Sequence, residues 1–252
     1  MIYIGTSGWN YPHWTGLFYP ERMTTHEQLA YYARHFRTVE INRSFYRLPD
    51  RGQFAVWAEV TAGVPGFVFA VKGSRYLTHM RKLREPEEAI MRLLDAASGL
   101  GDQLGPVLFQ LPPRWRANLD RLRTFLALLP ANRRYVIELR DASWYADDVL
   151  AVLDEYGCAL AVAVGGPLPT PVEMRAPGPF GYIRFHNGLS GPGLTDGELA
   201  FWADRIATES AARDVYVYFN NDIGGYAIHD ARTLRAMLAG RGAPLQPVEP
   251  AR

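Results

Sequence analysis

Acidic, basic and imidazole side chains stand where several short apolar segments of the sequence end. Glu40 and Glu138 offer carboxylates for acid–base chemistry, and His186 offers an imidazole whose ordinary pKa lies near neutrality. Cations and amides occupy equivalent positions, namely Lys72, Arg140 and Arg184 with Asn42, Gln110 and Asn220. Cations bind anionic groups, and amides orient hydroxyls or carbonyls. The set predicts proton transfer on a small anionic or sugar-like substrate, by a hydrolase, lyase or isomerase.

Alternation along these segments indicates that the polar side chains share one face. Side chains of a strand point to opposite faces in turn, so Glu40 and Asn42 lie opposite Val39 and Ile41. The same alternation extends the polar face through three later segments, with Glu138, Arg140, Tyr182, Arg184, His186, Tyr218 and Asn220. Lys72 and Gln110 join it from two further segments.

Eight such segments run through the chain, most of them separated by helical stretches. They span residues 2–5, 38–42, 67–72, 107–111, 135–139, 159–164, 182–186 and 215–220. Eight strand–helix units in 252 residues favour a (β/α)8 TIM-type barrel over the alternative, an open doubly wound sheet. No Gly-x-Gly-x-x-Gly follows the first strand, which weighs against a dinucleotide site.

Domain boundaries follow from composition. Residues 1–240 are expected to form the single barrel domain, and 241–252 a flexible proline-rich tail. The connection after the sixth segment carries Pro167, Pro169, Pro171 and Pro177, so the sixth unit is expected to be degenerate.

A barrel places its active site at the carboxyl ends of the strands, where these polar residues lie. Trp9 and Trp144 follow strands and would stack on a ligand, or pack loops over the mouth. The cations predict an anionic ligand such as a phosphate or carboxylate. The alternative is a buried ion network that pairs the charges with one another.

Charge and cysteine content limit the remaining classes. Twenty-seven Lys and Arg stand against 26 Asp and Glu, so no global charge attracts nucleic acid or a membrane. Cys158 is the only cysteine and opens an apolar run, which favours a core thiol. Without a leader or an apolar span, the protein is expected to be cytoplasmic and to have no membrane partner. The oligomeric state stays open.

Three other functions remain as alternatives. A divalent metal could be held by Glu40, Glu138 and His186, although no cofactor is the main prediction. The basic, aromatic mouth could bind or repair nucleic acid. The same pocket could also serve a non-catalytic metabolite-binding protein.

Several motifs together give the chain a resemblance to the YecE-like family, also called domain of unknown function 72. They are Gly5-Thr-Ser-Gly-Trp9, Val39-Glu-Ile-Asn42, Phe69-Ala-Val-Lys72, Leu108-Phe-Gln-Leu-Pro-Pro113, Glu138-Leu-Arg140, Arg184-Phe-His186 and Tyr218-Phe-Asn-Asn221. The resemblance covers residues 2–238 and implies a TIM-barrel-like fold, with no established activity. It departs from the family where the sixth segment ends in Ala163-Val164-Gly165 rather than an acidic residue, and where Asn187 precedes Gly188.

Overall fold

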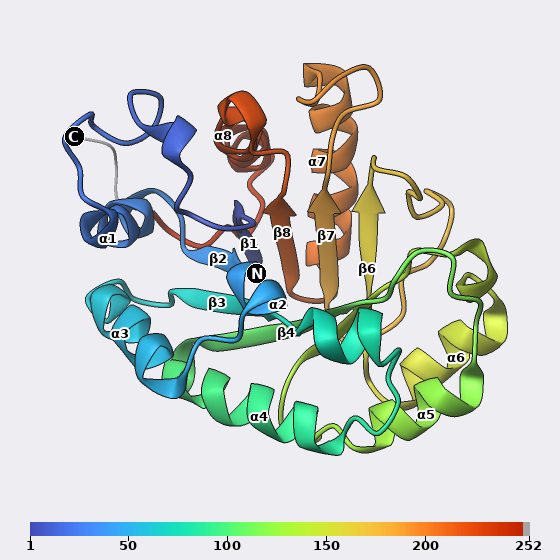
Figure 1. Ribbon diagram of the computed structural model, residues 1–252. Coiled ribbons are helices and arrows are strands. Elements are labelled where there is room, and N and C mark those ends of the chain that lie inside the picture. Colours follow the sequence, from blue (N-terminus) through green and yellow to red (C-terminus); the bar gives the residue numbers. More distant parts are fainter. Residues whose placement is uncertain (249–252) are drawn as a thin grey trace.

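The computed structural model describes residues 1–248 and contains one eight-stranded parallel sheet rolled into a nearly closed barrel (Figure 1). The spatial order is β1-β8-β7-β6-β5-β4-β3-β2, so the strands follow the chain around the barrel. The strands are β1 (Ile2–Thr6), β2 (Thr38–Ile41), β3 (Val68–Lys72), β4 (Leu104–Gln110), β5 (Tyr135–Glu138), β6 (Ala159–Val164), β7 (Gly181–Phe185) and β8 (Val215–Phe219). The predicted (β/α)8 class is confirmed.

Helices surround the strands (Figure 1). They are α1 (Thr25–His35), α2 (Arg43–Tyr46), α3 (Arg51–Thr61), α4 (Glu87–Ala97), α5 (Leu119–Ala127), α6 (Asp147–Glu155), α7 (Asp196–Ser210) and α8 (Tyr226–Gly240). Short turns of helix are η1 (Pro12–Trp14), η2 (Tyr76–Met80), η3 (Ser98–Gln103), η4 (Ala142–Trp144) and η5 (Ile223–Gly225). Capping boxes of Thr24 with Glu27 and of Thr195 with Glu198 fix where α1 and α7 begin.

Two apolar layers follow from the strand alternation. The outward side chains, such as Val39 and Ile41, pack under the helices in a continuous core. A smaller inner cluster fills the barrel, with Leu108, Tyr182 and Tyr218 among its members. The polar face of the strands therefore begins above this inner apolar cluster.

The sixth unit lacks a helix, as its prolines predicted. Within the described chain, residues 165–180 between β6 and β7 are turns and irregular backbone. Thr170 binds this segment back to β6, because its backbone N–H donates to the Ala163 carbonyl at 2.9 Å and its hydroxyl accepts from the Ala163 N–H at 2.9 Å. β6 pairs with β5 at only two register positions. The contacts with Thr170 therefore provide hydrogen-bond partners for backbone groups of β6 that the strand pairing leaves unsatisfied.

The junction between β1 and β2 is closed mainly by side chains. One isolated bridge joins Ser7 to Glu40. Below it the Tyr32 hydroxyl on α1 accepts from the Thr6 N–H at 2.9 Å and donates to the Thr38 carbonyl at 3.1 Å. A methyl group on Gly5 would lie 2.1 Å from the Thr38 oxygen, so glycine is needed for this close approach.

Part of the predicted tail is paired with the barrel. Leu245 forms a parallel bridge with Ile2, whose N–H donates to the Pro244 carbonyl at 2.8 Å. The Gln246 N–H donates in turn to the Ile2 carbonyl at 3.1 Å. These hydrogen bonds were not expected for a flexible tail, and residues 249–252 lie outside the described residues.

Candidate functional site

Arg184 and Glu40 form the buried centre of the polar face. The Arg184 Nε donates to Glu40 Oε2 at 2.9 Å, and an Arg184 terminal nitrogen donates to Glu40 Oε1 at 2.6 Å. The Ser7 and Tyr182 hydroxyls each donate to a Glu40 oxygen at 2.6 Å. Both side chains are fully buried. Burial would raise the pKa of Glu40, but Arg184 and Lys72 hold the pKa below its usual range.

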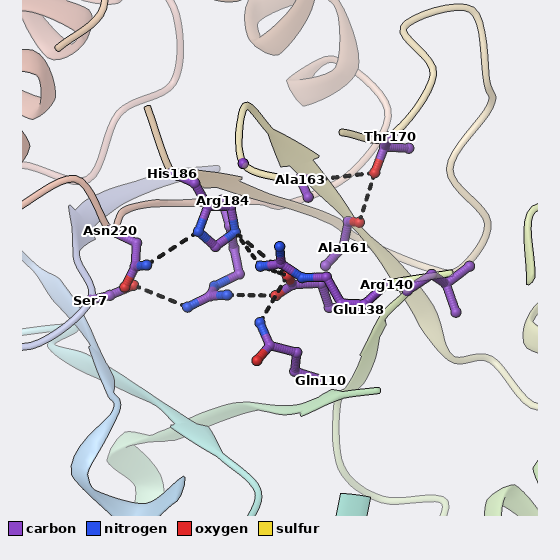
Figure 2. Close-up of polar contacts among 12 residues, drawn as sticks. Ser7, Gln110, Glu138, Arg140, Ala161, Ala163, Thr170, Arg184, His186 and Asn220 are labelled. Atoms are coloured by element: carbon purple, nitrogen blue, oxygen red, sulfur yellow. Dashed lines mark hydrogen bonds and ion pairs between the residues drawn. The ribbon is translucent and has the colours of Figure 1, made fainter. Parts of the chain in front are cut away.

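Glu138 on β5 binds the Arg184 guanidinium from its other side. Its Oε2 accepts from Arg184 at 2.5 Å, and its Oε1 accepts from Gln110 at 3.0 Å and from Arg140 (Figure 2). Burial raises the pKa of Glu138, but Arg184, His186 and Arg140 outweigh it and hold the pKa well below its usual range. Glu138 is therefore a carboxylate at neutral pH.

His186 lies above Glu138 and is linked to β2 and β8 through two amides. Its Nε2 is 3.5 Å from Glu138 Oε1 and 2.9 Å from an Arg140 terminal nitrogen. The Asn220 side-chain N–H donates to His186 Nδ1 at 3.2 Å, and the Asn42 amide donates to Asn220 at 3.1 Å. Burial lowers the pKa of His186, with Glu138 opposing this shift, so the ring is neutral at pH 7.

Lys72 ends β3 and is the least satisfied cation of the face. Among the described residues, no carboxylate lies within 4.0 Å of its Nζ, and no acceptor is hydrogen-bonded to it. Its Nζ lies over the Phe45 ring, 4.3 Å from the centroid. Burial and then Arg184 lower the pKa of Lys72 to about 8, against the opposing effect of Glu138 and Glu40.

Three predicted ligand-binding side chains lie away from this layer. Tyr218 is fully buried in the inner apolar cluster, with its hydroxyl 2.6 Å from the Thr38 hydroxyl. Trp144 is also fully buried and donates to the Trp115 carbonyl at 2.6 Å, so it packs loops rather than facing the mouth. Trp9 contacts Trp57 edge to face at 5.1 Å and packs against the outer core.

Ser7 and Tyr182 are the important contacts that the site prediction omitted. Strand alternation placed Tyr182 on the polar face, two residues before Arg184, but Tyr182 was not predicted to be a site residue. Ser7 follows β1 and meets Glu40 only because the barrel closes, which no local pattern reveals.

Two cavities lie beside the polar layer. One of about 600 Å³ opens between the start of α1, the end of β2 and α3, and is lined by Trp9, Asn42 and Trp57. The other, of about 560 Å³, lies between α2, η2 and α4, and is lined by Phe45, Tyr46 and Arg81. Of the predicted site residues, only Trp9 and Asn42 line either cavity.

Residues 1–248 contain neither a metal-binding cluster nor a membrane-spanning helix. No group of three or more His, Cys, Asp and Glu side chains there could hold a metal ion. The three side chains that the metal alternative requires are held differently, because Arg184 occupies oxygens of both Glu40 and Glu138. No described helix is both long enough and apolar enough to cross a bilayer.

Fold and site together define an α/β barrel whose mouth is built on an ion network, with Arg184 binding two carboxylates. The sequence family described as protein of unknown function DUF72 matches residues 3–252. The chain therefore belongs to this family, as the motifs predicted.

Two curated relatives and one solved structure support the assignment. UPF0759 protein YecE of Escherichia coli K12 is 33% identical over 147 residues, which cover 58% of this chain and about half (51%) of YecE. UPF0759 protein YunF of Bacillus subtilis 168 is 25% identical, and the matched region covers 94% of this chain and 95% of YunF. The crystal structure of a DUF72 family protein from Thermotoga maritima MSB8 has a TM-score of 0.80 and 25% identity, covering 95% of this chain and 99% of the other.

Proposed function

We propose that this barrel is an enzyme that binds a small anionic substrate at its mouth and transfers protons through His186. The observation that carries the proposal is a surplus of cationic donors. Lys72, Arg140 and Arg184 stand against the two carboxylates, which leaves a formal charge of +1 when His186 is neutral. The Arg140 Nε is buried with no hydrogen-bond partner. A bound carboxylate or phosphate would supply the missing acceptors.

The two carboxylates take different roles in this proposal. Glu40 has both oxygens occupied by Arg184, Ser7 and Tyr182, so it positions the guanidinium. Glu138 contacts the His186 ring and can stabilise it as the ring gains a proton. Neither carboxylate is held protonated, which argues against a carboxylic acid as the proton donor.

Thermal shift with a ligand panel tests the anion site. Carboxylic acids, sugar phosphates and neutral sugars are added to the purified protein, because a ligand that binds the native state raises the melting temperature. We expect at least one anion to stabilise the protein, and Arg140→Ala to abolish that shift. Arg205→Ala is the matched control, since Arg205 is exposed on α7 and lies outside the loops that follow the strands. Stabilisation by neutral sugars alone, or an equal shift in Arg140→Ala, would contradict the proposal.

A cationic arc around part of the mouth supports nucleic-acid binding as a second candidate. The segments after β2, β3 and β4 (42–50, 73–86 and 111–118) carry eight Arg and Lys residues against two acids. These are Arg43, Arg47, Arg75, Arg81, Lys82, Arg84, Arg114 and Arg116 against Asp50 and Glu85. Fluorescence anisotropy with a single-stranded oligonucleotide should then show binding that weakens steeply with salt. Absence of binding at low salt would remove this candidate.

A further inference from the structure

Lysine is rare in this chain. The sequence has 25 arginines and only two lysines, Lys72 and Lys82. Lys82 lies in the arginine-rich segment after β3, whereas Lys72 is the last residue of β3 at the barrel mouth. Arginine and lysine both provide a positive charge, but only a lysine amine can lose its proton near neutral pH, when its surroundings lower its pKa, and so become a nucleophile. A buried lysine in an arginine-rich chain therefore indicates a need for the amine itself.

The residues around Lys72 enclose its amine without providing a carboxylate to pair with its charge. The Ser44 hydroxyl donates to the Lys72 carbonyl at 2.6 Å and fixes the end of β3. The Phe45 ring covers the amine from one side, 4.3 Å from Nζ. Only 8% of the Lys72 residue surface is exposed. An ion-paired lysine would have a carboxylate within 4.0 Å, and among residues 1–248 both nearby carboxylates bind Arg184 instead.

We propose that Lys72 is the nucleophile of a Schiff-base reaction with a small oxo acid, its amine attacking the carbonyl carbon while Arg140 binds the carboxylate. This inference rests on the proposed anion site and names its substrate class. Arg140 is suited to the second role because its Nε lacks a partner. A 2-oxo acid places the carbonyl next to the carboxylate, which matches an amine and a guanidinium that share one mouth.

The bond changes balance without an external oxidant or reductant. The Nζ lone pair forms the C–N bond, and the carbonyl π electrons move to oxygen, which takes a proton. The resulting carbinolamine loses one proton from nitrogen, and its hydroxyl leaves as water after gaining a second proton. The product is an iminium ion on Lys72 and one water molecule. We assign the acceptance and return of protons to His186, which is neutral beside Glu138.

The protonation state of Lys72 agrees with this role. Because burial and Arg184 lower the pKa of Lys72 to about 8, roughly one tenth of the amine is neutral at pH 7. An ordinary lysine has well under a thousandth of its amine neutral at that pH. The low pKa slightly weakens each neutral amine as a nucleophile, so we expect a net rate advantage of at least about tenfold.

Reductive trapping tests the inference directly. The protein is incubated at pH 7 with glyoxylate and cyanoborohydride, which reduces an iminium to a stable carboxymethyl-amine, and the adducts are located by peptide mass mapping. With two lysines and the N-terminal amine as the only aliphatic amines, the map has few sites to resolve. We expect Lys72 to be modified at least about tenfold faster than Lys82. Lys72→Arg keeps the charge and should lose this adduct, while Lys82→Arg should leave it unchanged.

The outcomes separate this inference from the proposed function. Equal or faster modification of Lys82 would overturn the Schiff-base role of Lys72. If glycolate, which lacks the carbonyl, still slows labelling of Lys72 or stabilises the protein, the anion site stands without that chemistry. If Lys72 reacts as fast with neutral propionaldehyde as with glyoxylate and Arg140→Ala changes neither rate, the amine is reactive but the anion site is wrong.

Discussion

Arg184 on β7 reaches across the barrel and forms a two-point ion pair with Glu40 on β2, with nitrogen–oxygen distances of 2.9 and 2.6 Å. The same guanidinium binds Glu138 on β5. β7 is two strands from β5 and, across the β1–β2 junction, three strands from β2, so one side chain connects three separate strands. Removing it would leave two carboxylates in a fully buried position without their main partner.

Arg184→Met should therefore destabilise the protein strongly. Breaking a buried ion pair by removing one partner costs about 3–5 kcal/mol, because the remaining charge is left unpaired. Urea denaturation followed by circular dichroism measures the change in the free energy of unfolding. Arg116→Ala, at an exposed position, should change it by less than about 0.5 kcal/mol. Similar stability of the two variants would show that the network does not stabilise the fold.

Acid should destabilise the barrel through the same carboxylates. The folded-state pKa values of Glu40 and Glu138 are lowered, so their contribution is complete above the ordinary glutamate pKa of 4.5 and is lost as pH falls below it. Each carboxylate then removes up to about 1.4 kcal/mol per pH unit. The urea midpoint should fall steeply below pH 4.5, and Glu138→Gln should flatten that dependence. A midpoint that stays constant from pH 5 to pH 3 would rule out ion pairing of these groups.

Strand alternation predicted much of the site, because it requires only that each segment be extended. It placed Glu40, Lys72, Gln110, Glu138, Arg184 and His186 on one face, and the structure shows them there. Depth along the strand was not predictable in the same way. Tyr218 shares the polar face but lies in the inner apolar cluster. The pairing of Glu40 with Arg184 was not predictable either, because it depends on barrel closure.

The loop residues were predicted least well, since their positions depend on tertiary packing. Trp144 follows β5 as a rim residue would, yet its ring is buried against Trp115. The pairing of Leu245 with Ile2 joins two segments that lie far apart in the sequence, and neither segment carries a local signal for it. The missing helix after β6 was predicted because proline excludes helix directly.

Tyr32→Phe should weaken the junction between β1 and β2. The substitution removes the hydroxyl that satisfies the Thr6 N–H and the Thr38 carbonyl, two buried backbone groups. Leaving such groups unsatisfied costs about 1–3 kcal/mol. Hydrogen exchange should show faster exchange of the Thr6 amide in this variant. Tyr31→Phe on the same helix is the matched control and should leave that amide as protected as in the native protein.

Cys158 should be unreactive in the folded protein. It is buried, and burial raises the pKa of its thiol, which suppresses the reactive thiolate. A chromogenic disulfide reagent should therefore report one thiol in guanidinium chloride and almost none under native conditions. Rapid labelling under native conditions would mean that Cys158 is accessible to solvent and would support a chemical role for its thiol.

The closure of the β1–β2 junction by side chains also affects how the chain folds during its synthesis. β1 obtains its ladder from β8, at residues 215–219, and its second bridge from Leu245. β1 leaves the ribosome long before these partners, so nearly the whole barrel must be synthesised before β8 can provide β1 with its ladder. The Tyr32 hydroxyl on α1 lies only 26 residues after Thr6 in the sequence, so it can bind β1 long before these partners are made.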